Sequence, residues 1–406
     1  MTKDEEYTME NKWEMLESSN EDRERIWKKN RTFAGDVWFR FRHKPTSIAG
    51  FVIIVLLLLF ALAGPLFTNY SYKEQNLEVV NVPPVMKVFD APDGDGYFYI
   101  TQALKLLKVN EDGTLGVQLK KVREESDSSM TIYDYNGKEV AVYYGVKPYV
   151  VADPETRVIY SSDKVINKSY ILGTDSLGRD NLTRLMYGTR ISLLVAFVAV
   201  LVNMIIGIIY GGISGYAGGM TDTVMMRIVD IIYSLPDVLI VILLSVAIKD
   251  IISTSKNELI IKLGAGMISI FIVFGLLYWV GMARQVRGQI LSIKEQEYVL
   301  AARAMGASPM HIIMKHMIPN CVSVIIITAA MQIPSAIFTE SYLSFLGLGV
   351  NAPMPSLGSL ASDALNGINS YPYRLVIPAV VISLIVLSLN LLGDGLRDAF
   401  DPKLNG

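Results

Sequence analysis

Six long apolar segments constrain the fold of this chain more than any other feature. A helix needs ~20 mostly apolar residues to cross the ~30 Å hydrocarbon layer of a bilayer. Segments of about that length lie near residues 48–67, 190–212, 225–248, 263–283, 318–340 and 374–393. The chain has 406 residues, of which 51% are hydrophobic. We therefore expect an all-α polytopic membrane protein with six transmembrane helices.

Charge before the first apolar segment predicts the orientation of the chain. Lysine and arginine concentrate on the cytoplasmic side of membrane spans. Against one carboxylate, Asp36, this stretch carries Lys28, Lys29, Arg31, Arg40, Arg42 and Lys44. We expect a cytoplasmic N-terminus, and six crossings return the C-terminus to the same side. The polar residues that precede the segment favour an anchor over a cleaved signal peptide.

The same pattern predicts five regions along the chain. They are a cytoplasmic tail (1–46), the first transmembrane helix (47–69), an extracytoplasmic insert (70–170), a core with helices two to six (171–393) and a cytoplasmic C-terminus (394–406). The core contains a polar loop, 284–317, which this topology places in the cytoplasm. The tail is charged and gives no further functional indication.

The insert is expected to be rich in β-structure. Asn136-Gly137 stands between two β-prone arms in residues 131–144, a strong signal for a hairpin. A second turn is predicted at 110–113, and further strands at 96–100 and 157–161. About a hundred residues can bury a modest core, so a small domain is expected here. Its role is open between a docking surface, a lid and a structural addition.

The polar loop carries the pattern of two short helices joined at a corner. Residues from Lys294 to Met305 favour a helix, and its alanines, including Ala304, would form a surface of low relief. Gly306 can end this helix in the left-handed conformation, and Ser308-Pro309 can start a second one. The prediction is a rigid elbow, either a docking element or a capped hairpin at the membrane surface.

The elbow resembles the EAA motif in permease subunits of ATP-binding-cassette importers. The matching residues are Glu297, Ala301, Ala302, Gly306, Ile312 and Pro319-Asn320. In that family the segment is the coupling helix, which sits in a groove of a cytoplasmic ATPase. The resemblance implies coupling roles for Glu297, Tyr298, Ala301, Ala302, Arg303, Gly306, Ala307, Ile312 and Pro319.

A glycine-rich segment precedes the second apolar segment. Gly173 and Gly178 have the spacing of a phosphate-binding loop, but Arg179-Asp180 stands where lysine and then serine or threonine would be needed. The segment instead resembles the GTD-x-LGRD sequence of the oligopeptide and dipeptide permease family. Asp175, Arg179 and Asp180 are expected to form an ion-pair network at the helix entry, or else to be solvated surface residues.

Further likeness to this family lies in the SFLGLGV run, in Pro353, Pro355 and Ser356, and in the closing GD-x-LRD-x-x-DP sequence. The resemblance covers residues 48–67 and 171–403. It implies the six-helix fold of type I importer permeases. The insert is longer than that pattern requires, and the tail matches nothing in it.

Ionisable residues within the third apolar segment suggest a pathway or a hinge. Asp230 and Asp237 would be costly in hydrocarbon and normally face a bundle interior or water. Arg227 precedes Asp230 by three residues, so a helical ion pair is the favoured alternative. Pro236 is expected to kink the helix and could serve as a hinge.

The sequence contains no catalytic or metal-binding constellation. It has one cysteine, Cys321, and three histidines, His43, His311 and His316, which do not form a cysteine–histidine cluster. Zincin, nucleophile-elbow and Walker motifs are absent as well. The chain is therefore expected to be a non-catalytic subunit with no cofactor or metal of its own.

As the resemblance implies, this is the C-type permease of an oligopeptide importer in a bacterial cell membrane. Its partners would be a second, B-type permease, two ATPases that bind ATP and magnesium, an extracytoplasmic peptide-binding protein, membrane lipid and the peptide, with no nucleic acid. An importer of dipeptides, or of nickel or other metal chelates, is the alternative within this class. An ion-driven transporter or an anchored scaffold is the alternative outside it.

Overall fold

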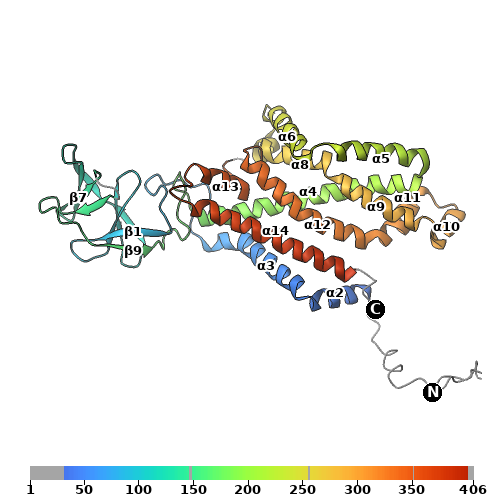
Figure 1. Cartoon of the computed structure of the whole chain (residues 1–406), viewed down its shortest axis with the longest axis horizontal. Coiled ribbons are helices and arrows are strands. Elements are labelled where there is room, and N and C mark those ends of the chain that lie inside the picture. The colour runs from blue at the N-terminus through green and yellow to red at the C-terminus, as the bar shows by residue number, and fades with distance from the viewer. Residues whose placement is uncertain (1–31, 146–148, 255–256, 351, 401–406) are drawn as a thin grey trace, which may run out of the picture.

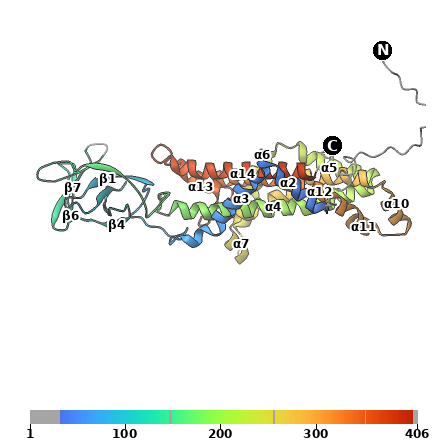
Figure 2. The same cartoon turned by 90° about the horizontal axis from the view of Figure 1, so that it is seen from below.

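The computed structural model describes residues 32–145, 149–254, 257–350 and 352–400. Of the predicted terminal regions, residues 1–31 and 401–406 lie outside this part. The molecule is elongated, and its β-rich insert and its elbow lie at opposite ends of a helical bundle (Figures 1 and 2).

The helices of the bundle account for most of the described chain. The segments before the second span are α2 (Phe33–His43), α3 (Pro45–Leu62) and the 3-10 helix η2 (Gly64–Phe67). The central helices are α4 (Asn181–Ala217), α5 (Gly219–Ser234), α6 (Asp237–Ser253), α7 (Glu258–Leu263), α8 (Ala265–Leu277) and α9 (Trp279–Ile293). The remaining segments are α10 (Glu297–Ala304), α11 (Pro309–Ile312), the π-helical turn η3 (Ile313–Met317), α12 (Ile318–Phe345), α13 (Leu357–Leu365) and α14 (Tyr373–Phe400).

Five described helices are long and apolar enough to cross a membrane, and a sixth span results if α5 and α6 count as one. The axes of these two helices differ by 91°. Leu235 and Pro236 have extended backbone between them, and proline cannot donate the hydrogen bond that would continue α5. The predicted kink at Pro236 is therefore a full break rather than a bend within one straight span.

Helix α4 is the centre of the bundle and packs closely on α9. Gly207 and Gly211 make this approach possible, because a Cβ on either would lie 2.5 Å from Met282 Cβ or 2.4 Å from the Ala283 carbonyl oxygen. Small residues allow such close helix contacts in membranes. Helices α3, α8, α12 and α14 also contact α4 and share an apolar cluster with it.

Two antiparallel sheets form the insert. The strands are β1 (Val85–Asp90), β2 (Tyr97–Ile100), β3 (Leu106–Val109), β4 (Leu115–Gln118), β5 (Lys120–Glu125), β6 (Met130–Tyr135), β7 (Lys138–Tyr143), β8 (Val150–Ala152) and β9 (Ser162–Ile166). The first sheet has the order β4-β3-β2-β1-β9 and the second β5-β6-β7-β8. Buried side chains from both sheets, such as Phe98 and Val140, share one apolar cluster.

Local turn signals predicted most of this insert correctly. The Asn136-Gly137 hairpin joins β6 to β7, and the turn at 110–113 joins β3 to β4. The strand predicted at 157–161 is wrong. The Asp153 carboxylate accepts hydrogen bonds from the Glu155 and Thr156 amides, and this turn leaves Arg157 at a φ of 55°. The chain becomes a strand only at Ser162.

Candidate functional site

The predicted elbow lies at the end of the bundle opposite the insert (Figure 1). Helix α10 ends before Gly306, whose φ is 80°. The Gly306 amide donates to the Arg303 carbonyl at 3.0 Å, and the Ala307 amide to the Ala302 carbonyl at 3.1 Å. These contacts satisfy carbonyls at the helix end, as a glycine-terminated helix requires. Capping by the Ser308 hydroxyl, which accepts from the His311 amide, then starts α11 at Pro309.

The second arm of the elbow is longer than predicted. Helix α11 continues through the π-turn η3 into α12, so the helical segment Pro309–Phe345 has 37 residues. Cap signals alone could not predict this length, because no helix-stop signal separates α11 from α12. Consequently α10 is joined through one glycine corner to the end of a membrane-spanning helix.

Residues predicted to couple the elbow divide into an exposed face and a buried one. Glu297, Tyr298, Ala301 and Arg303 of α10 are exposed, as are Gly306 at the corner and Pro319 at the start of α12. Ala302 is buried, so its predicted place on the low-relief docking surface is wrong; Ile312 is buried as well, and Ala307 is half-buried. The reason is geometric, since one face of α10 must pack on the bundle.

This buried face connects the elbow to two long helices. Val299, Ala302 and Ile312 share a cluster with Met282 and Ile290 of α9 and with Cys321 of α12. The Arg303 guanidinium also lies over the Tyr216 ring, 5.4 Å from its centroid. Through this shared cluster, α10 is connected to α9 and α12.

Exposed methionines beside the predicted face were missed by sequence reasoning. Met305, at the tip of the elbow, is 82% exposed, and Met310 and Met314 are exposed on the second arm. Unbranched methionine adapts its shape to a partner surface. The sequence signal that could have identified these methionines is their position on either side of Gly306.

Two ion pairs join α5 to α9 next to the elbow. Arg287 donates to Asp222 from Nε at 2.6 Å and from Nη2 at 2.6 Å. Arg284 donates to Asp230 at 2.7 Å and lies over the Tyr233 ring at 4.1 Å. The predicted pairing of Asp230 with Arg227 is thus replaced by one with Arg284, because α9 runs alongside α5.

Asp237 has a different environment from Asp230. It lies at the start of α6 and lines a cavity of about 370 Å³ together with Tyr278, Pro334, Thr339 and Asn390. The Tyr278 hydroxyl donates to Asp237 at 3.4 Å. Asp237 is therefore the predicted pathway residue that faces a cavity, beside the break at Pro236.

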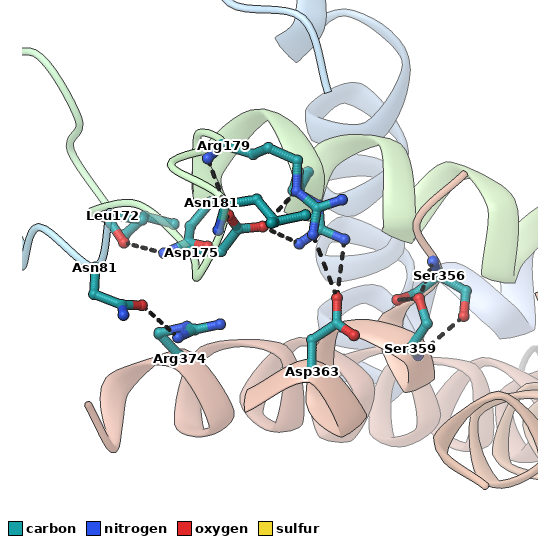
Figure 3. A network of polar contacts seen from close by, with 11 residues as sticks. Asn81, Leu172, Asp175, Arg179, Asn181, Ser356, Ser359, Asp363 and Arg374 are labelled. Atoms are coloured by element: carbon teal, nitrogen blue, oxygen red, sulfur yellow. Dashed lines mark hydrogen bonds and ion pairs between the residues drawn. The ribbon is translucent and has the colours of Figure 1, made fainter. Parts of the chain in front are cut away.

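A buried polar network joins the insert to the bundle (Figure 3). Asp175 accepts hydrogen bonds from the Leu177 and Arg179 amides, from Arg179 Nε at 2.7 Å and from Arg184. The other end of Arg184 donates to Asp363 of α13 at 3.1 Å. The expected network of Asp175 and Arg179 is present and buried, so these residues are not solvated surface charges.

Asp180, the third residue expected in this network, caps α4 instead. Its carboxylate accepts from the Thr183 amide at 2.8 Å. Burial is the largest single influence on the pKa of both carboxyls, and taken alone it would raise each pKa. For Asp180 the pKa remains above its ordinary value. For Asp175 the charges of Arg184 and Arg179 and two backbone amides outweigh burial, and the net pKa lies below its ordinary value.

Gly173 and Gly178 hold the base of the insert. Their φ values are both 69°, and added Cβ atoms would lie 2.4 Å from the Val82 carbonyl oxygen and 1.8 Å from the Asn76 carbonyl oxygen. Between them Thr174 exchanges hydrogen bonds with Val82, accepting from its amide at 2.8 Å. The glycines therefore serve close packing against residues 76–82, in agreement with rejection of a phosphate-binding loop.

Three further buried polar residues were missed, and for two of them, Arg374 and Arg184, a partner is distant in sequence. Arg374 of α14 donates to Asn81 of the insert at 2.7 Å, and Arg184 reaches Asp363. Glu340 of α12 is fully buried and accepts from the Ser344 hydroxyl at 2.8 Å. Within the described ranges, no group of three histidine, cysteine, aspartate or glutamate side chains could hold a metal ion.

These observations define a multi-pass helical membrane protein with a capped helical elbow at one end. The family model described as "Binding-protein-dependent transport system inner membrane component" matches residues 203–406. The chain belongs to this family. A second model, the "N-terminal TM domain of oligopeptide transport permease C", matches residues 32–84.

Curated relatives agree with this assignment. The chain is 33% identical to the oligopeptide transport system permease protein OppC of Bacillus subtilis (strain 168), over 97% of each chain. It is 48% identical to the dipeptide transport system permease protein DppC of the same organism, over 57% of this chain and 68% of the relative. Among solved structures, an inward-facing methionine ABC transporter, MetNI, aligns with a TM-score of 0.41 and 22% identity, over 54% of this chain and 96% of that chain.

Proposed function

We propose that this chain is one of two permease subunits of an ATP-driven oligopeptide importer in a bacterial cell membrane. The observation that carries the proposal is the elbow, which presents an exposed face to a partner and a buried face to the bundle. The placement of charge before the first span favours a cytoplasmic elbow and cytoplasmic termini. On this arrangement the insert is extracytoplasmic, because it occupies the other end of the molecule.

Coupling would run from the exposed face of α10 into the bundle. A groove of a cytoplasmic ATPase would receive Tyr298, Ala301 and the tip residue Met305. Closure of an ATPase pair on ATP and magnesium would then move α10. The buried contacts of Val299 and Ala302 would pass this movement to α9 and α12. Interfaces with two discrete arrangements can convert small shifts of this kind into domain movements.

The remaining partners follow from the same arrangement. A second, B-type permease would complete the pathway through the membrane, and a peptide-binding protein would deliver cargo at the insert. Asp237 and Tyr278, which line a cavity, are the residues we place along the pathway. ATP and magnesium would be held by the ATPases, and the chain itself would perform no covalent chemistry.

A full-length alignment with one oligopeptide permease supports oligopeptides as cargo. The alignment with OppC covers 97% of this chain and so includes the insert, whereas the alignment with DppC covers 57%. On this proposal, the binding protein for longer peptides would dock on the insert. Sequence identity in the core does not discriminate between the two kinds of cargo, because OppC and DppC share the family pattern there.

Purification of the tagged chain from its native membrane tests the proposal. We expect a second permease and two P-loop ATPases to co-purify, and the complex with its binding protein to import labelled pentapeptides in the presence of ATP. Isolation of the chain alone, under conditions that preserve other transport complexes, would contradict the importer assignment. Competition by dipeptides but not by pentapeptides would retain the importer and overturn only the cargo.

A further inference from the structure

An apolar groove lies where the first helices meet the ends of α12 and α14. It has a volume of about 430 Å³. The lining side chains are all apolar or aromatic: Val37, Trp38, Phe41, Phe51, Val322, Ile326, Leu392, Leu396 and Phe400. The α12 wall of the groove begins at Val322, next to Cys321 of the cluster that packs on the elbow, but no described residue of the elbow or of the insert lines the groove.

Helix α2 forms one wall of the groove and has the character of an interfacial helix. It is capped by Thr32 and ends at Lys44, and Pro45 then starts α3 in a new direction. Lys44 forms an ion pair with Asp398 near the end of α14, which ties α2 to the last span. Trp38 is exposed beside the groove. Amphipathic helices with tryptophan and basic residues lie in the headgroup region of membranes.

Basic side chains are present on two of the helices that line the groove. Arg42 of α2 and Arg397 of α14 are exposed, and neither forms an ion pair with another residue in the described part of the chain. In the sequence, Lys28, Lys29 and Arg31 directly precede α2. A juxtamembrane basic cluster attracts anionic lipid, with a contribution from each lysine or arginine near the surface. Of the carboxylates on these two helices, Asp36 pairs with Arg40 and Asp398 with Lys44, whereas Asp394 is exposed, so Arg42 and Arg397 are the described residues that complement a negative headgroup.

We propose that this groove binds one acyl chain of an anionic phospholipid, whose phosphate group is held by the basic residues around Arg42 and Arg397. The apolar lining matches an acyl chain, since it offers no polar partner that a peptide or nucleotide would need. The basic rim matches the phosphate. The proposal relies on the cytoplasmic placement of α2 given above but not on oligopeptide as cargo.

Native mass spectrometry of the purified complex, taken from nanodiscs of equal parts phosphatidylglycerol and phosphatidylethanolamine, tests this site. We expect phosphatidylglycerol to be retained with about a fivefold enrichment, the factor that a single lysine or arginine near the surface supplies. Ile326→Trp would fill the groove from α12 and should abolish the enrichment. Val380→Trp, on an exposed position of α14 outside the groove, should leave it unchanged.

A second set of variants separates the headgroup from the acyl chain. Arg42→Gln combined with Arg397→Gln should remove the preference for phosphatidylglycerol while a bound lipid of either kind remains. Lys138→Gln, an exposed site in the insert, is the charge control. No enrichment in the wild type, or enrichment that survives Ile326→Trp, would overturn the proposal and leave only unselective boundary lipid.

Quenching of tryptophan fluorescence provides a measurement that does not depend on filling the groove. Brominated phosphatidylglycerol should quench the wild type more strongly than the Trp38→Phe variant, whereas brominated phosphatidylethanolamine should show a smaller difference. Equal differences for the two lipids would contradict the site. Because neither experiment uses ATP or peptide, failure here is distinguishable from failure of the importer assignment.

Discussion

Arg287 of α9 holds Asp222 of α5 through two parallel hydrogen bonds, each 2.6 Å long. A planar guanidinium paired with a carboxylate in this way fixes both distance and orientation. The same carboxylate accepts from Ser214 near the end of α4. Three helices therefore meet at one side chain, close to the elbow that we propose receives the ATPase.

The coupling of Asp222 to Arg287 can be measured by a double-mutant cycle with Asp222→Asn and Arg287→Gln. We expect an interaction free energy of about 1 kcal/mol or more, since contacting groups in a shared network couple at that scale. Thermal unfolding in detergent supplies the data. The control pair is Arg123 with Glu139, both well exposed on the insert, for which little coupling is expected. Equal coupling in the two pairs would contradict the conclusion that Asp222 holds three helices together.

Gly306→Val tests the corner of the elbow. The position has a φ of 80° and open space around it, so the cost is conformational strain rather than a clash. A side chain there costs at least about 1 kcal/mol, and a β-branched one more. We expect peptide uptake per ATP hydrolysed to fall in proteoliposomes. Gly288→Val, on the exposed part of α9 with equally open space, should leave that ratio unchanged.

Gly178→Ala tests the clamp at the base of the insert. Both Gly178 and Gly137 have positive φ, but only at Gly178 would the new Cβ meet a backbone atom, at 1.8 Å. We expect Gly178→Ala to cost about 1–3 kcal/mol more than Gly137→Ala, as overpacking against a rigid neighbour does. Limited proteolysis at the insert reports the difference. Similar digestion of the two variants would contradict this expectation and show that the backbone of residues 76–82 can shift at little energetic cost.

The low pKa of Asp175 predicts a specific pH dependence. Because the pKa is lower in the folded protein than in the unfolded chain, the stabilising contribution is complete above the unfolded value and is lost as pH falls through the folded one. Asp180, with a raised pKa, acts in the opposite direction, so total stability is a poor readout. We expect the stability difference between the wild type and Asp175→Asn to shrink as pH falls below about 4, near the ordinary carboxyl value. A constant difference would contradict this.

Local signals predicted a large part of the elbow and of the insert. The cap at Ser308, the left-handed Gly306 and the hairpin at Asn136-Gly137 all depend on the conformational preferences of a few adjacent residues. Most of the apolar spans could be predicted equally well, because crossing a bilayer demands a continuous run of apolar residues. Family resemblance then indicated the class of protein, which the match over residues 203–406 confirms.

Contacts across the bundle were decided by the tertiary structure alone. Arg184 and Asp363 are 179 positions apart, and Arg287 and Asp222 are 65 apart. Asp230 pairs with Arg284 rather than with the nearby Arg227, because α9 runs alongside α5. Ala302 lies on the buried face of α10 because that face packs on the bundle. By itself the sequence determined five of the six apolar spans, the turns and the caps, since these arise within a few residues or one helix. The fold decided which charges meet, which face of the elbow is free and how α5 breaks from α6, since these depend on which helices become neighbours.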